Sequence, residues 1–399
     1  MKIKRSIMFN QMSGKLFREL AEDIAAKFPE ESELCTGNID ASNFISKSKK
    51  LKIEKFPIYN RKSKMTRVIS WLIFTFFSFI KMIYAPKNTL IFIVTNPPLI
   101  VIATWLVCKI RKLPYVILVY DIYPDVLIKF KVLKKKSIVA RIWRFLNKVT
   151  FENSCAVYTI GDFMAENLSK QFNVNKTKLK YIEVIPPWAD TNIIKPIKKS
   201  ENPLAKKFNQ IKCVTVLYSG NMGISHDIES ILKAAKLLKQ KKNIKFIFIG
   251  EGEKFKSSLE FVKSEKLHNV KVLPLQPENK IHYTLALGDI SIASLDKGAE
   301  GLMLPSKIYY YIATGSAVIG ICEGTNDLAK SLIKGNFGIT VSPGNYKKLA
   351  KTILFLAKNT SKLKKFRDNA RSSSISKYSR KVCVKKFEKS LKSINLLPY

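Results

Sequence analysis

The stretch EGLMLPSKIYYYIATGSAVIG, residues 300–320, predicts a short helix that is followed by a buried strand. Pro305 suits the first turn of a helix, and Gly315 suits the position just after its end. Ser306 and Lys307 place a hydroxyl and an ammonium beside the unpaired amide groups of the helix start, where an anion such as phosphate is favoured. An ordinary helix start in an α/β domain explains the same residues, so the stretch alone leaves both interpretations open.

Composition limits the class of protein. A chain of 399 residues that is 46% hydrophobic is long enough for two cores, so we expect two domains. Lysine and arginine total 70 against 30 acidic residues, and the net charge of +40 points to nucleic acid, anionic lipid or a phosphorylated substrate. Lysine-biased codon usage is an alternative explanation for part of the same excess, and the charge count does not distinguish the two. The six cysteines and three histidines show no CxxC or HExxH spacing, which predicts reduced thiols and no zinc site.

Strand and helix patterns alternate through both halves of the chain. The predicted strands are residues 5–11, 51–58, 89–95, 115–120, 155–160, 181–185, 214–218, 244–249, 270–273, 290–293 and the run from 316. Helices are expected between them and, after this last strand, to the end of the chain. The alternation predicts parallel, doubly wound α/β sheets, in which ligands bind beyond the carboxyl ends of the strands. The lysine-rich segment 195–207, which follows a run of prolines, marks the boundary between the halves.

Two segments of the first half suggest contact with a membrane. Val68–Ile80 is uncharged for 13 residues, too short to span a bilayer, which takes about 20. It is either a helix buried in a core or one that lies in the membrane interface, and we favour the second. Residues 129–148 combine cations with aromatic side chains and fit an anionic membrane surface, although a solvated basic helix face has the same composition. The first ten residues lack a signal-peptide run, which predicts a cytoplasmic protein at the inner face of the plasma membrane.

Four ordered segments carry a more specific signal. They are TNPPLIVIATWL from residue 95, VYDIYPD from 119, VIPPWADTNIIKP from 184 and GLMLPSKIYYYIATGSAVI from 301. Together they resemble the retaining, nucleotide-sugar-dependent family 4 glycosyltransferases, especially the bacterial branch that builds O-antigen and capsular polysaccharide with N-acetylfucosamine-like amino sugars. The resemblance extends over nearly the whole chain.

This resemblance implies a GT-B fold, in which two Rossmann-like α/β domains face each other across a cleft. Residues 1–195 would form the acceptor-binding, membrane-facing domain, residues 196–375 the nucleotide-sugar-binding domain, and residues 376–399 a helix that crosses back to the first domain. The donor would be a UDP-sugar bound as co-substrate, without a cofactor or metal. The absence of a DxD motif from the second half agrees with that expectation.

The resemblance also implies a set of donor-binding residues. Ser306 and Lys307 would hold the diphosphate, and the turns at 250–252 and 275–276 would surround the nucleoside. Gly14, which follows the first predicted strand, is a weaker signal because a full GxGxxG motif is absent. The complete set is Gly14, Gly220, Asn221, Gly223, Gly250, Glu251, Gly252, Leu275, Gln276, Glu300, Gly301, Leu302, Pro305, Ser306, Lys307 and Tyr310.

Catalysis in the resembled family is described as front-face attack, in which the acceptor hydroxyl gives its proton to the leaving phosphate. A protein nucleophile is then not required. Asp121 and Asp125 match the family's acidic turn, and we expect them to orient acceptor or sugar hydroxyls. The alternative is that they only cap a helix, a position in which aspartate is common.

Two departures from the family pattern affect the donor site. Asn221 and His226 occupy the turn in which many relatives carry an arginine and a lysine, so Lys307 becomes the expected cation for the diphosphate and His226 a weaker candidate. Tyr310 stands where relatives have the second glutamate of a pair, whose carboxylate would bind the ribose. Either the ribose is held differently or the donor binds weakly.

The sequence therefore predicts a hexosyltransferase-type enzyme that moves an N-acetylated amino or deoxy sugar from a UDP-sugar to a lipid-linked or polysaccharide acceptor. A UDP-N-acetylhexosamine 2-epimerase on the same fold is one alternative, and a catalytically silent member of the family is another. A basic nucleic-acid-binding protein is a third. Nucleic acid is not expected as a partner, because the sequence shows no RNA-recognition, zinc-finger or helix-turn-helix signature.

Overall fold

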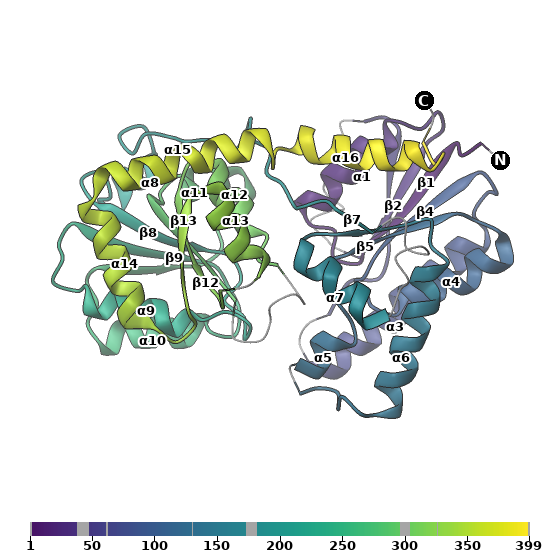
Figure 1. The fold of residues 1–399 in the computed structure, drawn as a ribbon, viewed down its shortest axis with the longest axis horizontal. Helices are drawn as coiled ribbons and strands as arrows, with labels where there is room; N and C mark the ends of the chain where they lie inside the picture. The colour runs from purple at the N-terminus through teal and green to yellow at the C-terminus, as the bar shows by residue number, and fades with distance from the viewer. Residues whose placement is uncertain are drawn as a thin grey trace. The chain divides into compact units, whose positions relative to one another are not determined.

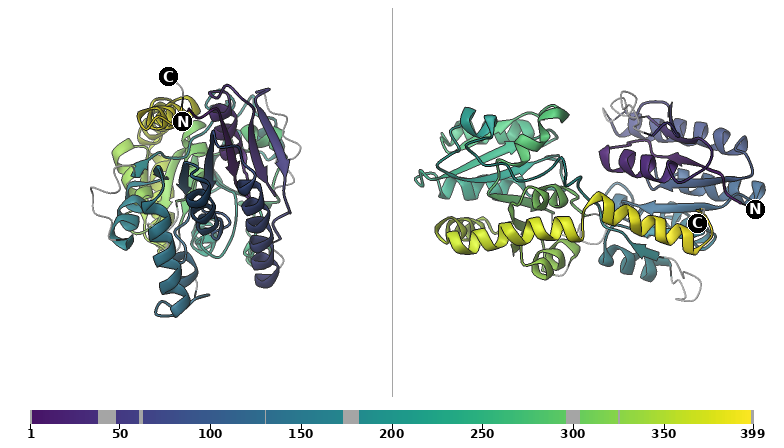
Figure 2. Two further views of the ribbon diagram at one scale, coloured as in Figure 1. Left: turned by 90° about the vertical axis from the view of Figure 1, so that its right-hand side faces the viewer. Right: turned by 90° about the horizontal axis from the view of Figure 1, so that it is seen from above.

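The computed structural model describes residues 2–37, 48–60, 63–129, 131–172, 182–295, 304–324 and 326–397. Its contacts divide the chain into two compact units. The first runs up to Pro186 and resumes at Cys383, and the second is Pro187–Val382. The sequence prediction had placed these boundaries after residues 195 and 375. The expected plan of two doubly wound α/β domains is confirmed, because each unit contains one parallel sheet with helices on both faces (Figure 1, Figure 2).

The sheet of the first unit has seven strands in the order β3-β2-β1-β4-β5-β6-β7, and every pairing is parallel. The strands are β1 (Arg5–Phe9), β2 (Ser32–Thr36), β3 (Leu51–Lys55), β4 (Thr89–Val94), β5 (Tyr115–Val119), β6 (Ala156–Thr159) and β7 (Ile182–Val184). Residues 89–94, TLIFIV, are all buried, as expected for a parallel strand with helices on both faces. The sequence analysis had not predicted β2.

Helices cover both faces of this sheet. They are α1 (Lys15–Ala25), α3 (Lys64–Ile83), α4 (Ile100–Arg111), α5 (Asp125–Lys129), α6 (Ile138–Glu152), α7 (Asp162–Phe172) and α16 (Arg380–Ser393). Figure 1 shows α1 and α16 on one face and α3, α4 and α6 on the other. The C-terminal helix α16 belongs to the first unit from Cys383 onward, where Phe387 packs edge-on against Tyr158 with a ring separation of 4.8 Å.

Helix α3 is longer than the sequence analysis predicted. Ser63 and Thr66 form a capping box that starts the helix before the uncharged run, and Lys81 lies within its last turn. By length and hydropathy, the segment Met65–Ile83 is long enough to cross a bilayer, and only 28% of its most apolar window is buried. The prediction that this segment is too short to span was therefore wrong, because it took the flanking cations as the ends of the helix.

Contacts along one stripe of α3 attach it to the sheet of the first unit. Trp71, Phe74 and Met82 are buried at helical spacing. The Lys81 ammonium lies 2.5 Å from a carboxylate oxygen of Glu33 on β2 and 2.5 Å from one of Glu54 on β3. The ion pairs explain why a lysine is tolerated in an apolar helix.

The sheet of the second unit has six parallel strands in the order β10-β9-β8-β11-β12-β13. The strands are β8 (Val214–Ser219), β9 (Ile244–Ile249), β10 (Val270–Leu273), β11 (Ile290–Ser294), β12 (Ala317–Ile321) and β13 (Gly338–Val341). The existence of β13 corrects the expectation that only helices follow β12. Its four residues begin with glycine and bury only the last, so the apolar signal is weak.

Helices also lie on both faces of the second sheet, with α9, α10 and α14 on one face and α11, α12, α13 and α15 on the other (Figure 1). They are α8 (Pro203–Lys207), α9 (Ile228–Leu237), α10 (Phe255–Ser264), the 3-10 turn η1 (Glu278–Lys280), α11 (Ile281–Leu285), α12 (Lys307–Ala313), α13 (Asp327–Gly335), α14 (Tyr346–Lys358) and α15 (Thr360–Ser376). The boundary segment predicted at 195–207 thus ends in a helix. Asn202 caps it by accepting from the amide of Leu204 at 3.0 Å.

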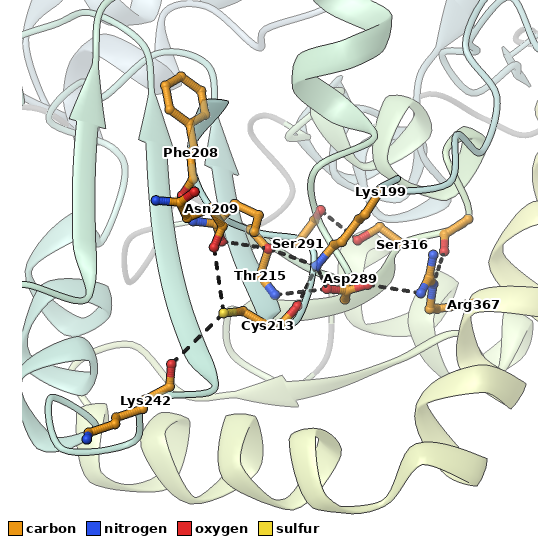
Figure 3. A network of polar contacts seen from close by, with 12 residues as sticks. Lys199, Phe208, Asn209, Cys213, Thr215, Lys242, Asp289, Ser291, Ser316 and Arg367 are labelled. Carbon is orange, nitrogen blue, oxygen red and sulfur yellow. Dashed lines mark hydrogen bonds and ion pairs between the residues drawn. The ribbon is translucent and has the colours of Figure 1, made fainter. Parts of the chain in front are cut away.

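A buried carboxylate joins several elements at the amino end of this sheet (Figure 3). Asp289, which precedes β11, accepts from the backbone N–H of Thr215 at 2.9 Å and from the Arg367 guanidinium at 3.0 Å. It also pairs with the Lys199 ammonium, which donates in turn to the carbonyl of Cys213 at 2.6 Å. The Asp289 side chain, just before β11, thus connects the segment around Lys199 with β8 and α15.

We expect Asp289→Ala to destabilise the second unit strongly. The substitution leaves the Lys199 ammonium buried without its carboxylate, and breaking a buried ion pair on one side costs about 3–5 kcal/mol. Urea denaturation followed by circular dichroism measures the change. The control is Asp368→Ala, which removes an exposed pair with Lys364 and should cost less than about 1 kcal/mol. Equal losses for the two variants would contradict a role for the network.

Candidate functional site

Two glycine turns meet at the carboxyl edge of the second sheet. The turn after β8 contains Gly220, with φ +129°, and the turn after β9 contains Gly250 and Gly252, the latter with φ +125°. A Cβ on residue 250 would lie 1.9 Å from the Gly220 carbonyl oxygen, so only glycine fits there. The amide of Met222 donates to the carbonyl of Glu251 at 2.7 Å and closes the contact between the turns.

Two buried tyrosines hold the turn after β8 through hydrogen bonds to its backbone. The Tyr311 hydroxyl of α12 contacts both the amide nitrogen and the carbonyl oxygen of Ser219 at 2.9 Å, so it donates to one backbone group and accepts from the other. The Tyr218 hydroxyl donates to the carbonyl of Asn221 at 2.7 Å. Both rings are 0–1% exposed, which makes these hydroxyls fixed supports for the turn.

Lys307, the first residue of α12, brings a cation to this turn. Its ammonium donates to the Tyr218 hydroxyl at 2.7 Å and lies 3.9 Å from the centre of the Tyr218 ring. A Cβ added at Gly220 would be 3.4 Å from the same nitrogen. Burial lowers the pKa of Lys307 to about 7, and no carboxylate among the described residues pairs with it. A cation held by neutral groups beside a glycine turn is suited to an anionic ligand.

His226 does not supply a second cation. Burial first, and then the charges of Lys307 and Lys254, lower its pKa to about 3, so the imidazole is neutral at physiological pH. The expectation that His226 is a weaker candidate for the diphosphate cation is therefore corrected. The histidine side chain instead packs edge-on against Tyr218, with ring centres 6.4 Å apart.

An open hollow of about 550 Å³ lies beside the glycine turns, at the ends of β9 and β10. Gly250, Glu251 and Gly252 line one side, and Pro274 and Leu275 line the other. The Leu275 side chain is 50% exposed, so it offers an apolar face to a planar ligand. The amide of neighbouring Gln276 is turned back and donates to the Pro274 carbonyl at 2.9 Å.

The remaining predicted donor residues belong to α12 and its approach. The helix has seven residues and ends before Gly315, whose φ of +65° confirms the predicted glycine end. Pro305 is buried, and exposed Ser306 makes no side-chain cap. Tyr310 is partly buried against the hydrophobic core. Glu300, Gly301 and Leu302 lie outside the described residues.

The acidic turn predicted for the acceptor lies at the carboxyl end of β5 in the first unit. Asp121 is half-buried, and burial raises the pKa of its carboxyl group to about 6. The Thr95 hydroxyl accepts from the amide of Asp121 at 3.3 Å. Asp125 is the first residue of α5 and forms an ion pair with Arg144 of α6. The two aspartates therefore differ: Asp125 is neutralised by Arg144, whereas no described cation pairs with Asp121.

Three aromatic rings and an amide clamp this turn between α3 and α6. Tyr123 packs edge-on against Trp71 of α3 at 6.0 Å and stacks on Trp143 of α6 at 6.4 Å. The Asn147 amide of α6 donates to the Tyr123 carbonyl at 2.8 Å. The turn is thus positioned by the two helices that carry the predicted membrane-facing segments.

The predicted donor residues do not all belong to one place. Gly220, Asn221 and Gly223, with the turn at 250–252 and Lys307, come together at one edge of the second sheet. Gly14 lies in the first unit just before α1, and a Cβ there would meet nothing within 4 Å, so its position does not require glycine.

Sequence reasoning missed the side chains that position the rest. They are Tyr218, Tyr311, Thr95, Arg144 and Asn147. Their roles depend on contacts between segments far apart in the chain. The only available signal was a polar or aromatic residue placed next to a predicted strand end.

Comparison with known proteins agrees with this geometry. Residues 202–373 match the family model described as glycosyl transferases group 1. The second unit carries a group 1 glycosyltransferase domain. This makes the chain an enzyme of the transferase class, and residues 202–373 contain the described residues of the second unit that were predicted to bind the donor.

Relatives and solved structures extend the likeness to the first unit. "Probable glycosyltransferase WbjE" of Pseudomonas aeruginosa is 24% identical over 300 residues, which are 75% of this chain and 74% of that protein. "Putative colanic acid biosynthesis glycosyl transferase WcaI" of Escherichia coli (strain K12) is 30% identical over 116 residues, 29% of this chain and 28% of that protein.

The crystal structure of Anabaena Alr3699/HepE in complex with UDP aligns with a TM-score of 0.72 at 14% identity, over 98% of this chain and 100% of that one. WaaG, a glycosyltransferase involved in lipopolysaccharide biosynthesis, aligns at 0.67 and 14%, over 96% and 99%. These structural likenesses establish the GT-B fold of the chain.

The contact between the glycine turns gives a test of the site's construction. Gly250→Ala should lower the free energy of unfolding by about 1–3 kcal/mol, because its Cβ would overlap the Gly220 carbonyl oxygen. The thermal midpoint should fall by about 2–4 °C for each kcal/mol. Gly324→Ala is the matched control, since a Cβ there meets nothing within 4 Å. An unchanged midpoint for Gly250→Ala would mean that the turns are not in contact in solution.

Proposed function

We propose that this enzyme is a retaining glycosyltransferase that moves a sugar from a UDP-sugar to a lipid-linked or polysaccharide acceptor at the cytoplasmic face of the membrane. An N-acetylated amino or deoxy sugar is the proposed donor group, on the strength of the sequence resemblance to O-antigen and capsule enzymes. The observation that carries the proposal is the Lys307 ammonium, which lies beside the Gly220 turn with no described carboxylate to neutralise it.

A nucleoside diphosphate fits the groups around Lys307. The diphosphate would lie against the Gly220 turn, where the absence of a side chain allows close approach and the ammonium meets the negative charge. The nucleoside would occupy the hollow between the turn at 250–252 and Leu275. The complexes of HepE with UDP and with UDP-glucose support uridine as the base.

The charge on Lys307 also fits the proposed reaction. As the sugar leaves, negative charge grows on the departing phosphate, and a positioned ammonium stabilises it more in the transition state than in the ground state. The acceptor hydroxyl attacks the anomeric carbon from the same face, and its proton passes to the leaving phosphate oxygen. Asp121 is proposed to orient the acceptor hydroxyl, because its carboxylate, unlike that of Asp125, pairs with no arginine among the residues that the structure describes.

The first unit supplies a surface for the proposed membrane contact. One face of α3 exposes apolar side chains over its whole length, among them Leu72 at 51% and Phe76 at 61%. The first half of α6 adds Ile138, Ile142 and Phe145, each more than half exposed. The cations of residues 129–148 lie on α6 and in the segment that precedes it, and each can contribute about 1 kcal/mol near an anionic leaflet.

Helix α3 is proposed to lie in the membrane interface and not to cross the bilayer. A spanning helix would have to leave the sheet, because Lys81 is paired with both Glu33 and Glu54. It would also have to break the 2.8 Å hydrogen bond that the side-chain amide of Gln11 donates to the backbone carbonyl of Ser70. Exposing these charges and polar groups to lipid costs several kcal/mol, whereas an interfacial position keeps them satisfied.

UDP binding tests the diphosphate site. Lys307→Met should lower the affinity for UDP, measured by calorimetry, about tenfold to a hundredfold, since a charged hydrogen bond contributes roughly 1.5–3 kcal/mol. The control is Lys263→Met, which removes the same charge from the exposed face of α10 and should leave the affinity unchanged. If both variants lower the affinity for UDP equally, the nucleotide is attracted only by the net positive charge of the protein and not by Lys307 in particular.

The affinity for UDP should also depend on pH. The pKa of Lys307 is about 7 in the free protein, and a bound diphosphate raises it. The protonated form therefore binds better, so affinity is highest below pH 7 and falls by up to about tenfold per unit between pH 7 and 9. Calorimetry in buffers of different ionisation enthalpy should show proton uptake at pH 8. The Lys307→Met variant should lose both effects, and a flat profile for the native enzyme would contradict the assignment.

Vesicle sedimentation tests the membrane surface. The double variant Leu72→Ser with Phe76→Ser should reduce binding to anionic phosphatidylglycerol vesicles at least tenfold, because two large apolar side chains no longer enter the lipid. The control pair, Ile333→Ser with Phe355→Ser, removes exposed apolar residues from the second unit. Unchanged sedimentation of the α3 variant, or equal salt-sensitive retention on DNA, would contradict the proposal.

A further inference from the structure

A small cavity lies behind the acidic turn of the first unit. Its volume is about 10 Å³, the room that one water molecule needs. Most of the lining is apolar, from β5 and its neighbouring helices. Thr95, Asp121 and Asn147 lie at its wall and come from the ends of β4 and β5 and from the middle of α6. Tyr123 of the acidic turn also lines it.

These polar groups have matching hydrogen-bonding capacity left over. The Asn147 nitrogen donates to the Tyr123 carbonyl, which can only accept, so the orientation of the amide is fixed. The amide oxygen of Asn147 is buried and has no partner among the described residues. The Thr95 hydroxyl accepts from the amides of Tyr120 and Asp121 at 3.2 and 3.3 Å, and its proton is directed to no described acceptor.

We propose that Asn147 is a positioning residue for Asp121 and acts through one water molecule bound in this cavity. The water donates one hydrogen to the Asn147 amide oxygen and the other to the Asp121 carboxylate, and it accepts from the Thr95 hydroxyl. This arrangement gives a partner to the buried amide oxygen, which would otherwise cost roughly 1–3 kcal/mol. The role of Asp121 in the reaction rests on the proposed function, whereas the water site itself does not.

The surroundings of Asp121 leave this water as its main hydrogen-bond donor. No described N–H or O–H group donates to the carboxylate, and burial alone accounts for its raised pKa of about 6. The phenol of Tyr123 in the same turn lies close enough to interact with the Asp121 charge, and Tyr59 and Arg67 of α3 also interact with this phenol. Burial, and then the Asp121 charge, raise the pKa of Tyr123, and burial raises that of Tyr120, so both phenols stay neutral through the range in which Asp121 titrates. Arg144 of α6 is engaged by Asp125.

Two variants of the full-length enzyme test the inference. Asn147→Leu removes the amide, and Thr95→Val removes the hydroxyl without changing the shape of the side chain. Each should raise the pKa of Asp121 by about one unit, since the charged form loses a hydrogen-bond donor. Carbon-13 NMR of aspartate-labelled protein measures this pKa directly, with Asp121→Asn used to assign the signal. Asn153→Ala, at the exposed end of the same helix, should leave it unchanged.

Crystallography and kinetics complete the test. A crystal structure of the native enzyme should show one ordered water within hydrogen-bond distance of the three side chains, and Asn147→Leu should lose it. In transfer assays, the acid limb of the pH profile of kcat/KM should shift by the same amount as the Asp121 pKa measured by NMR. If Asn147 had only a structural role, its substitution would lower activity without shifting this limb. A dry cavity or an unshifted Asp121 would overturn the inference. If no transfer is detected with any sugar donor, the proposed function fails, yet the NMR and crystallographic results still decide the water site.

Discussion

The candidate site of the second unit depends on one close contact between backbones. The Gly220 carbonyl oxygen occupies the space that a side chain at residue 250 would fill. Because parallel strands deliver their following turns to the same edge, this contact sets the turns after β8 and β9 side by side, with the hollow at 250–252 next to the Lys307 ammonium.

Neutral hydroxyls, rather than opposite charges, hold this site in place. Tyr311 fixes the end of β8 and Tyr218 fixes the turn, and in the described part of the chain no carboxylate neutralises the Lys307 cation. A carboxylate in the place of Tyr218 would hold the ammonium equally well but would compete with an anionic ligand. The two aspartates of the first unit differ in the same way. Arg144 neutralises Asp125, whereas burial raises the pKa of the Asp121 carboxyl group.

The sequence predicted those parts of the structure that follow from local pattern. The strands Ile244–Ile249 and Val270–Leu273 have the predicted bounds, because each is an apolar run between clear turns. The strand Ser32–Thr36 was missed because Glu33 interrupts its apolar pattern, and only the structure shows that Lys81 pairs with this charge. The length of α3 was underestimated for the same reason. Lys81 was taken as the residue that ends the helix, whereas it lies within the last turn and pairs with Glu33 and Glu54.

Prediction of the site stopped at the same limit. Glycine turns and the start of α12 are local features, and the sequence located them correctly as turns and a helix start. Tyr218 is 89 residues from Lys307, and Arg144 is 19 residues from Asp125, so no spacing rule connects them. His226 shows the reverse error: a histidine beside a glycine turn suggests a cation, but its burial against Tyr218 makes it neutral.

Within the first unit, the proposed membrane surface and the acidic turn cannot be treated as independent. Trp71 and Trp143 both touch Tyr123, and they belong to the two helices whose outer faces carry the exposed apolar residues. Each helix therefore has the proposed membrane-facing surface on one side and the acidic turn on the other. An interfacial position of α3 and α6 would hold Tyr123 at a fixed depth below the membrane surface, which brings Asp121 within reach of a head group and leaves the acyl chains of a lipid-linked acceptor in the bilayer.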